Sequence, residues 1–211
     1  MLTQGGPNVD EPWQNCLTLC LDALTAGSLG IAAVVTDSAG AVLSRGRNQL
    51  FDGRDSPSPI KNTLVSHAEV NAIAALPEEY RRDKSIVLYT TVEPCPMCLG
   101  AIAMSPIRRV VVASRDPYAG AATLVEKHPW MKGKNIQFEF ESGDTEILFA
   151  SLHILSLLQR RELPLDHAFF ASFGELYPTV HRNMLSRCDD EELAVAIRQH
   201  DVRRVIEICS V

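Results

Sequence analysis

The chain has 211 residues, of which 46% are hydrophobic and 22% charged, a balance typical of a globular protein rather than a disordered or fibrous one. It carries 20 lysines and arginines against 26 acidic residues, and this net charge of −6 argues moderately against nucleic acid as its partner. No signal peptide and no apolar run long enough to cross a bilayer is present, so we expect no membrane contact. Six cysteines without a disulfide-framework spacing favour a reducing, cytoplasmic location.

The spacing of apolar residues predicts alternating helices and strands. In chain order we expect helices at 11–26, 68–76, 96–104 and 145–160, and strands at 31–36, 42–46, 86–90, 109–113 and 136–140. Such alternation predicts an α/β fold in which a central mixed sheet of about five strands lies between helices on both faces, a three-layer α/β/α arrangement.

The chain after residue 160 has a different character. Pro164 interrupts the helical pattern, and residues 190–200 and 202–208 have the periodicity of short amphipathic helices. We therefore predict a domain at 1–160 and a helical C-terminal extension at 161–211. The extension also holds an aromatic cluster, Phe169, Phe170, Phe173 and Tyr177. We favour packing of this cluster on the core or on a neighbouring subunit, and a cover for the functional site is the alternative.

Two short segments have metal-ligand spacing. His67 and Glu69 read H-x-E, and Pro94, Cys95 and Cys98 read P-C-x-x-C. Zinc prefers nitrogen and sulfur ligands, and a catalytic zinc keeps one coordination position for water. A structural zinc would normally have a fourth protein ligand, and no second pair of that kind lies nearby in the sequence. We therefore predict Zn²⁺ as cofactor, with His67, Cys95 and Cys98 as its ligands.

Glu69 can reach the same small space without binding the metal. We expect it to accept a proton from water, donate it to a ring nitrogen of the substrate and later protonate the leaving amine. Cys95 and Cys98 are expected in the first turn of the 96–104 helix, where the positive helix end favours thiolates. Ser66 is the expected N-cap of the helix that carries Glu69.

Residues 93–102, Glu-Pro-Cys-Pro-Met-Cys-Leu-Gly-Ala-Ile, resemble the cytidine-deaminase-like superfamily, in particular the branch of bacterial guanine deaminases and tRNA adenosine deaminases. Residues 67–73 and 88–91 match the same branch, and the resemblance covers roughly residues 11–159. It implies homodimers, or larger oligomers, in which neighbouring chains complete the pocket. The loop at 51–63 is longer than is usual for the branch.

Four residues are candidate substrate-binding residues. The resemblance places Asn48 at a substrate-binding asparagine, with a plain turn residue as the alternative. We include Ala68, which lies within the H-x-E segment. Glu126 falls near a carboxylate that guanine deaminases use, although an exposed glutamate beside Lys127 explains it as well. Trp130 suits stacking on a flat ring and closing the edge of the core equally.

The favoured interpretation is a zinc-dependent hydrolase that deaminates a small amino-substituted N-heterocycle and releases ammonia. Its substrate is a guanine-like or cytosine-like nucleobase or nucleoside, or an aminotriazine. The alternative is adenosine deamination in tRNA, which needs an open pocket mouth and a basic rim; residues 119–122 resemble the corresponding loop of tRNA adenosine deaminases. A third interpretation is a non-catalytic chain that retains zinc for structure. The expected partners are a heterocyclic amine and a second copy of the chain, rather than nucleic acid.

Overall fold

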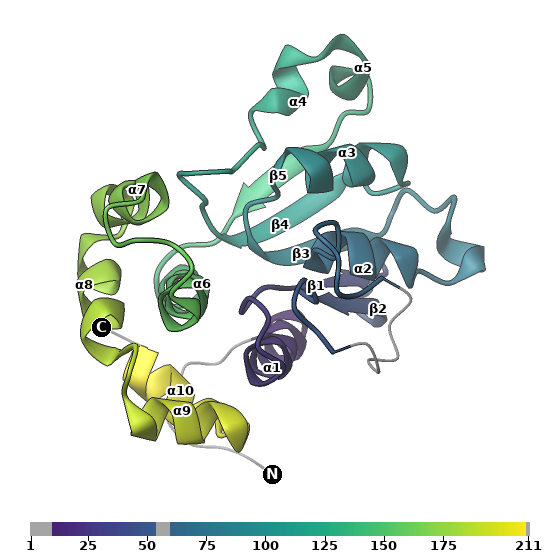
Figure 1. The fold of residues 1–211 in the computed structure, drawn as a ribbon. Helices are drawn as coiled ribbons and strands as arrows, with labels where there is room; N and C mark the ends of the chain where they lie inside the picture. Colours follow the sequence, from purple (N-terminus) through teal and green to yellow (C-terminus); the bar gives the residue numbers. More distant parts are fainter. Residues whose placement is uncertain (1–9, 54–59, 210–211) are drawn as a thin grey trace.

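The computed structural model describes residues 10–53 and 60–209, and a five-stranded sheet lies at its centre (Figure 1). The strands are β1 (Ala32–Thr36), β2 (Val42–Arg47), β3 (Val87–Val92), β4 (Arg109–Ser114) and β5 (Gln137–Phe140). Their order in the sheet is β2-β1-β3-β4-β5. β1 runs antiparallel to both β2 and β3, whereas β3, β4 and β5 are parallel. The predicted mixed sheet is confirmed.

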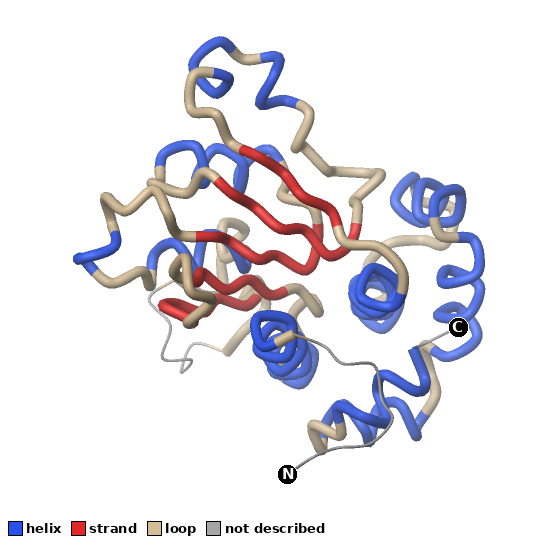
Figure 2. Tube along the Cα trace, turned by 180° about the vertical axis from the view of Figure 1, so that it is seen from behind, coloured by secondary structure: helices blue, strands red, loops and turns tan. Residues whose placement is uncertain are grey.

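Helices cover both faces of this sheet, as Figures 1 and 2 show. α2 (Ala68–Ala74) and α3 (Pro96–Met104) pack on one face, and α1 (Glu11–Thr25) and α6 (Asp144–Arg160) pack on the other. Each face has its own cluster of buried apolar residues. The inner strand β1 is buried along its whole length, as expected for a strand enclosed on both faces. The three-layer α/β/α fold is therefore confirmed.

The C-terminal segment folds as four helices that extend the α1 and α6 layer. They are α7 (Ala168–Leu176), α8 (Pro178–Arg187), α9 (Glu191–Arg198) and α10 (Val202–Cys209). Phe169, Phe170, Phe173 and Tyr177 are buried in the same apolar cluster as residues of α1 and α6. The favoured packing of these aromatic side chains on the core is confirmed. α7 and α8 were not predicted as helices.

Three further short elements lie outside the predicted set: η1 (Glu78–Tyr80), α4 (Leu124–Lys127) and α5 (Pro129–Lys132). Elements of three or four residues are too short to produce a recognisable periodicity. Part of the long loop predicted at 51–63 falls on residues 54–59, which lie outside the described residues. Within the part of the chain that the structure describes, no helix combines the length and the apolar character needed to cross a bilayer.

Candidate active site

His67 and Glu69 are presented by the first turn of α2. His67 is the N-cap residue, with an extended backbone (φ −80°, ψ 156°), and the helix begins at Ala68. The prediction that Ser66 caps this helix is wrong, because the Ser66 hydroxyl instead donates to the carbonyl of Ile60 at 2.7 Å. Ser66 thus fixes the loop that leads into the helix, and the imidazole and the carboxylate emerge side by side at the helix N-terminus.

β2 and α2 approach each other closely, and this contact holds the N-terminus of α2 against the sheet. A Cβ atom on Gly46 would lie 2.2 Å from the Ala68 carbonyl oxygen and 2.3 Å from the Ala72 nitrogen, so only glycine fits here. The Ser44 hydroxyl donates to the Ala72 carbonyl at 2.8 Å across the same contact. The strand therefore sets the position of His67 and Glu69.

The two cysteines stand at the N-terminus of α3. Cys95 is the N-cap residue, Pro96 is the first helical residue and Cys98 follows within the first turn. A proline at this position forfeits no hydrogen bond, because the first N–H groups of a helix have no partner within it. The predicted span of this helix is confirmed. The carbonyl of Pro94 accepts the N–H of Ala121 at 3.0 Å, which ties the cysteine segment to the chain after β4.

The three candidate ligands converge on one point. His67 Nδ1 lies 3.7 Å from Cys95 Sγ and 3.5 Å from Cys98 Sγ, and all three ligand atoms lie within 4.8 Å of one another. Tetrahedral zinc, with bonds of about 2.3 Å to sulfur and about 2.0–2.1 Å to nitrogen, places nitrogen and sulfur ligands about 3.6 Å apart. Among the described residues, no other group of histidine, cysteine and acidic side chains has this spacing. The donor set and its geometry fit zinc.

The pKa values of this cluster are shifted: that of Cys95 is lowered and that of the buried Glu69 carboxyl group is raised. A hydrogen bond from the Cys98 thiol lowers the pKa of Cys95 to about 4, and the same bond raises the pKa of Cys98. The hydrogen bond to Cys95 raises the pKa of His67. Burial raises the pKa of Glu69, whose Oε2 lies 3.3 Å from Cys98 Sγ. At Cys95 the cluster thus favours the thiolate form, in which cysteine binds metals, and the protonatable carboxyl group of Glu69 lies nearby.

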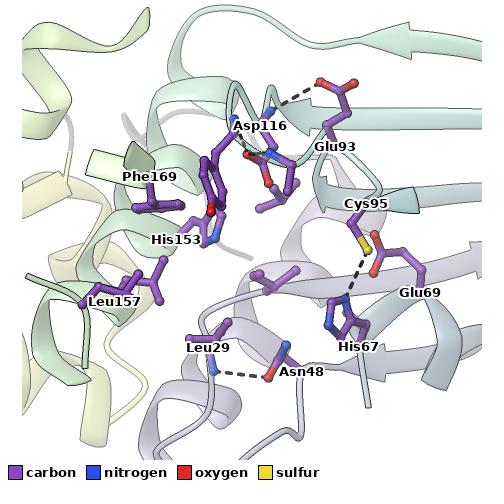
Figure 3. A pocket seen from close by; sticks show the side chains of 16 residues that line it. Leu29, Asn48, His67, Glu69, Glu93, Cys95, Asp116, His153, Leu157 and Phe169 are labelled. Atoms are coloured by element: carbon purple, nitrogen blue, oxygen red, sulfur yellow. Dashed lines mark hydrogen bonds between the residues drawn. The ribbon is translucent and has the colours of Figure 1, made fainter. Parts of the chain in front are cut away.

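A cavity of about 240 Å³ opens beside the cluster (Figure 3). One side, which we call the motif wall, consists of His67, Ala68, Glu69 and Cys95. The opposite side, which we call the C-terminal wall, consists of His153, Leu157, Leu163 and Phe169. Figure 3 shows His153, Leu157 and Phe169 across the cavity from His67, Glu69 and Cys95. The two walls enclose a space of roughly the size of a small ligand site.

Asn48 lines the cavity between the two walls and is 1% exposed. Its side-chain oxygen accepts the N–H of Leu50 at 3.2 Å and that of Leu29 at 3.4 Å. This leaves the amide nitrogen, which Figure 3 shows on the cavity side of the carboxamide. Asn48 can therefore offer an N–H donor to a ligand.

Glu93 also lines the cavity, but its carboxylate is used within the protein. One oxygen accepts the N–H of Ala122 at 3.1 Å and the other accepts that of Asp116 at 3.4 Å. The Asp116 carboxylate in turn accepts the N–H groups of Tyr118 and Ala119, each at 2.9 Å. Asp116 therefore stabilises the turn that follows it, and these carboxylates shape the loop at the pocket mouth.

Glu126 and Trp130 do not line this cavity. Glu126 lies in α4 with its side chain 71% exposed, and it forms an ion pair with Lys132 at 3.2 Å. Trp130 lies in α5, is 45% exposed and has the ammonium of Lys134 4.3 Å from its ring centroid. Within the single chain, the geometry gives no support to their substrate contact, which stays a prediction.

The C-terminal wall is the part of the site that the motifs did not indicate. Phe169 was foreseen only as the less favoured alternative, and His153, Leu157 and Leu163 were not singled out. A histidine within the apolar run of α6, between Leu152 and Ile154, is the one signal that pointed to this wall.

Comparison with known proteins supports the zinc site that the geometry of His67, Cys95 and Cys98 indicates. A family model described as the cytidine and deoxycytidylate deaminase zinc-binding region matches residues 10–114. The guanine deaminase of Bacillus subtilis (strain 168) is 33% identical over 112 residues, which are 52% of this chain and 66% of that protein. The chain belongs to the cytidine-deaminase-like superfamily. Within the superfamily it is similar to the branch of guanine and tRNA adenosine deaminases.

Two further matches differ in how much of the other protein they cover. The tRNA(Ile)-lysidine synthase of Deinococcus deserti is 31% identical over 115 residues, which are 54% of this chain but 20% of that protein. The chain therefore spans about a fifth of the length of this relative. A solved structure from studies of A-to-I editing by tRNA:A34 deaminases is 26% identical with a TM-score of 0.49, covering 63% of this chain and 96% of that one.

Proposed function

We propose that this chain is a zinc-dependent hydrolase that removes the amine from a small amino-substituted N-heterocycle and releases ammonia. The proposed substrate class is a guanine-like or cytosine-like nucleobase or nucleoside, or an aminotriazine. The observation that carries the proposal is the buried Glu69 carboxyl group next to the His67, Cys95 and Cys98 cluster, at the wall of a cavity of about 240 Å³. Relatives described as guanine deaminase and cytosine deaminase support this class of reaction.

In the proposed mechanism, His67, Cys95 and Cys98 hold the zinc. When bound, zinc acts as a Lewis acid that lowers the pKa of water and so supplies a hydroxide nucleophile at neutral pH. Glu69 accepts a proton from water at its carboxylate and passes it to a ring nitrogen of the substrate. It then accepts a second proton, from the hydroxyl group that water has added to the ring carbon, and gives this proton to the departing amine as the carbonyl forms. Burial raises the pKa of Glu69, and this favours its protonated form and so helps it to accept the proton that it passes on.

The remaining polar groups orient the ring. Asn48 donates its N–H to an acceptor atom of the heterocycle, since its oxygen is already bonded to the backbone. Ala68, in the motif wall, contributes to the shape of the cavity rather than to its polarity. Water is excluded on the far side by Leu157, Leu163 and Phe169.

The second candidate is adenosine deamination in tRNA. It is favoured by the tRNA-specific adenosine deaminase of Haemophilus influenzae, which is 34% identical over 108 residues. The cavity of about 240 Å³ and the net charge of −6 favour the small-molecule substrate instead. A flipped-out base on a tRNA would also need a basic rim to hold the flanking phosphates.

Three further properties belong to this proposal. The spacing of the six cysteines, which is not that of a disulfide framework, supports a cytoplasmic location. Residues 1–160 form the deaminase domain and 161–211 a helical extension that completes its pocket. We include homodimerisation of this chain because the resemblance to the superfamily implies it. Size-exclusion chromatography with light scattering tests the dimer, and a monomeric mass at micromolar concentration would contradict it.

The proposal is tested by measuring ammonia release from a panel of compounds by zinc-loaded protein. The panel contains guanine, cytosine, adenine, their nucleosides, melamine and a tRNA anticodon stem-loop. We expect turnover of at least one free heterocycle, and loss of that turnover after chelation with recovery on adding zinc. A zinc-loaded, folded protein that releases no ammonia from any of them would contradict the proposal and favour the non-catalytic interpretation.

A further inference from the structure

The C-terminal wall contains one titratable side chain, His153. It lies in α6, is 5% exposed and lines the cavity opposite Glu69 and Cys95 (Figure 3). Its ring contacts two aromatic rings of α7 edge to face. The ring centroid of Phe169 lies 5.2 Å away and that of Phe173 lies 5.3 Å away. The imidazole is therefore held in one orientation at the surface of the cavity.

His153 lacks the hydrogen bonds that a buried polar group normally makes. Its Nδ1 is fully buried and has no hydrogen-bond partner among the residues that the structure describes. The Asp116 carboxylate acts on it electrostatically, but that carboxylate accepts backbone N–H groups of Tyr118 and Ala119. Buried polar atoms are paired in the great majority of native sites. Nδ1 is enclosed by protein, so the side of the ring that a ligand in the cavity can hydrogen-bond is that of Nε2, which is not buried in this way and also has no hydrogen-bond partner among the described residues.

The protonation state of the imidazole defines which ligand fits. Burial lowers the pKa of His153, so the ring is neutral at physiological pH. A neutral imidazole has one N–H donor and one acceptor nitrogen, and the ligand determines which of them faces it. Such a group matches the mixed donor and acceptor edges of a purine, a pyrimidine or a triazine. It matches a phosphate poorly, because a phosphate is an anion that is best bound by a positively charged side chain.

We propose that His153 is a substrate-binding residue that hydrogen-bonds the polar edge of the heterocycle on the side away from Glu69, and thereby determines which ring the site accepts. This inference rests on the proposed function, since it names the recognition of the same substrate. Asn48 and His153 then hold the ring at two edges, while Leu157 and Phe169 enclose it. The motif wall determines the reaction, and His153 determines the substrate.

The test compares His153→Phe, His153→Gln and Phe173→Leu in zinc-loaded protein. His153→Phe keeps an aromatic ring for the contacts with α7 but removes both nitrogens, whereas His153→Gln keeps a donor and an acceptor. Phe173 contacts His153 but does not line the cavity, so Phe173→Leu is the control for packing alone. KM and kcat are measured for each panel compound that the wild-type protein deaminates.

We expect His153→Phe to raise KM about tenfold or more with kcat changed less than about threefold, and to alter the order of preference among the panel compounds. His153→Gln should restore part of the lost affinity. Phe173→Leu should lower the melting temperature, raise KM less than His153→Phe does and leave the order of preference unchanged. An unchanged KM and an unchanged order of preference in His153→Phe would overturn the inference while leaving the deaminase function intact.

A binding measurement separates the inference from the function on which it rests. Calorimetric titration of guanine, cytosine and melamine into zinc-loaded protein reports affinity without turnover. If a compound binds but no ammonia is released, and if His153→Phe binds that compound tenfold more weakly, His153 is supported and the proposed reaction fails. If the wild-type protein neither binds nor deaminates any of the panel compounds, both proposals are overturned.

Discussion

The motif wall and the C-terminal wall face each other across one cavity, but they are built in different ways. His67, Glu69 and Cys95 come from two helix N-termini whose chemistry can be read from a few residues of sequence. His153 comes from α6, which packs on the sheet and on α1, and Phe169 comes from α7, which packs on α8 and places the Phe169 ring against His153. The contrast teaches that reaction type is encoded locally, whereas substrate choice depends on tertiary packing. The predictions below test the two walls separately.

The largest effect is expected from removing a ligand of the motif wall. Cys98→Ser replaces a soft thiolate with a hydroxyl, so zinc affinity should fall by more than about 100-fold. Mutation of residues that only hydrogen-bond a metal ligand already lowers metal affinity by up to about 100-fold, and loss of a ligand itself should cost more. Zinc content after dialysis, measured by elemental analysis, reports the effect. Cys188→Ser, at a half-buried cysteine outside the cluster, should retain the metal. Full zinc content in Cys98→Ser would remove this residue from the ligand set.

The next largest effect is expected on kcat, from a change at Glu69 that leaves the zinc ligands in place. Glu69→Gln keeps the shape of the side chain but cannot carry a proton between water and the ring, so kcat should fall about 10³-fold. Zinc content should stay that of the wild type. Glu79→Gln, at an exposed glutamate in η1, is the matched control and should leave kcat unchanged. Near-wild-type turnover in Glu69→Gln would show that another group moves the proton.

A buried ion pair supports the loop that carries Asn48. Asp52 accepts two hydrogen bonds from the Arg47 guanidinium at 2.8 and 2.6 Å, and others from Gln49 and Ser28. Burial opposes its ionisation, but these bonds prevail and lower the pKa of Asp52 to about 2. Asp52→Asn should therefore reduce the free energy of unfolding by about 3 kcal/mol at pH 7.

The pH dependence of that difference has a definite sign. A carboxyl group whose pKa is lowered by folding stabilises the protein fully above its ordinary pKa of about 4, and this contribution is lost as the pH falls towards 2. Urea unfolding of the metal-free proteins should show the gap between wild type and Asp52→Asn narrowing from pH 5 to pH 2. A gap that widens on acidification would contradict the assigned charge state.

The smallest effect is expected where the C-terminal segment holds the pocket mouth. The Tyr177 hydroxyl accepts the N–H of Arg115 and donates to Glu146, both at 2.8 Å. Tyr177→Phe leaves both groups unpaired and should cost about 1–2 kcal/mol of unfolding free energy. Chemical denaturation measures this cost. Tyr80→Phe, in the short helix η1, is the control. No loss in Tyr177→Phe would mean that the loop after β4 does not depend on the C-terminal segment.

Much of the fold and of the motif wall could be predicted from sequence because short-range rules govern them. The β-branched strands, the proline at the start of α3 and the spacing of His67, Cys95 and Cys98 all act within a few residues. The zinc cluster then follows once two adjacent helix N-termini meet at the sheet. The N-cap of α2 was misassigned because the helix begins one residue later, after His67, and the Ser66 hydroxyl accepts the side-chain N–H of Asn71 instead of a backbone N–H of the helix.

α7 and α8 were harder to predict because each contains a glycine or a proline, residues that usually interrupt a helix but that are accommodated here. Pro178 is the first residue of α8, where proline is tolerated. Gly174 lies within α7, and a Cβ there would be 3.1 Å from the imidazole of His181. Both residues indicate turns when only the sequence is considered. Glu126 lies in α4, and α4 and α5 project away from the sheet (Figure 1), so the substrate contact predicted for Glu126 has no support within the single chain and stays a prediction.

The central claim, that the pocket serves a small ring rather than a polynucleotide, is tested most directly by ammonia release at 50 and 300 mM salt. Zinc-loaded protein is given guanine, cytosine or melamine in one series and a tRNA anticodon stem-loop in the other. We predict turnover of a free ring compound with a KM that is nearly independent of salt, because no phosphate is bound. Turnover of the stem-loop alone, with a KM that rises steeply with salt, would contradict the claim.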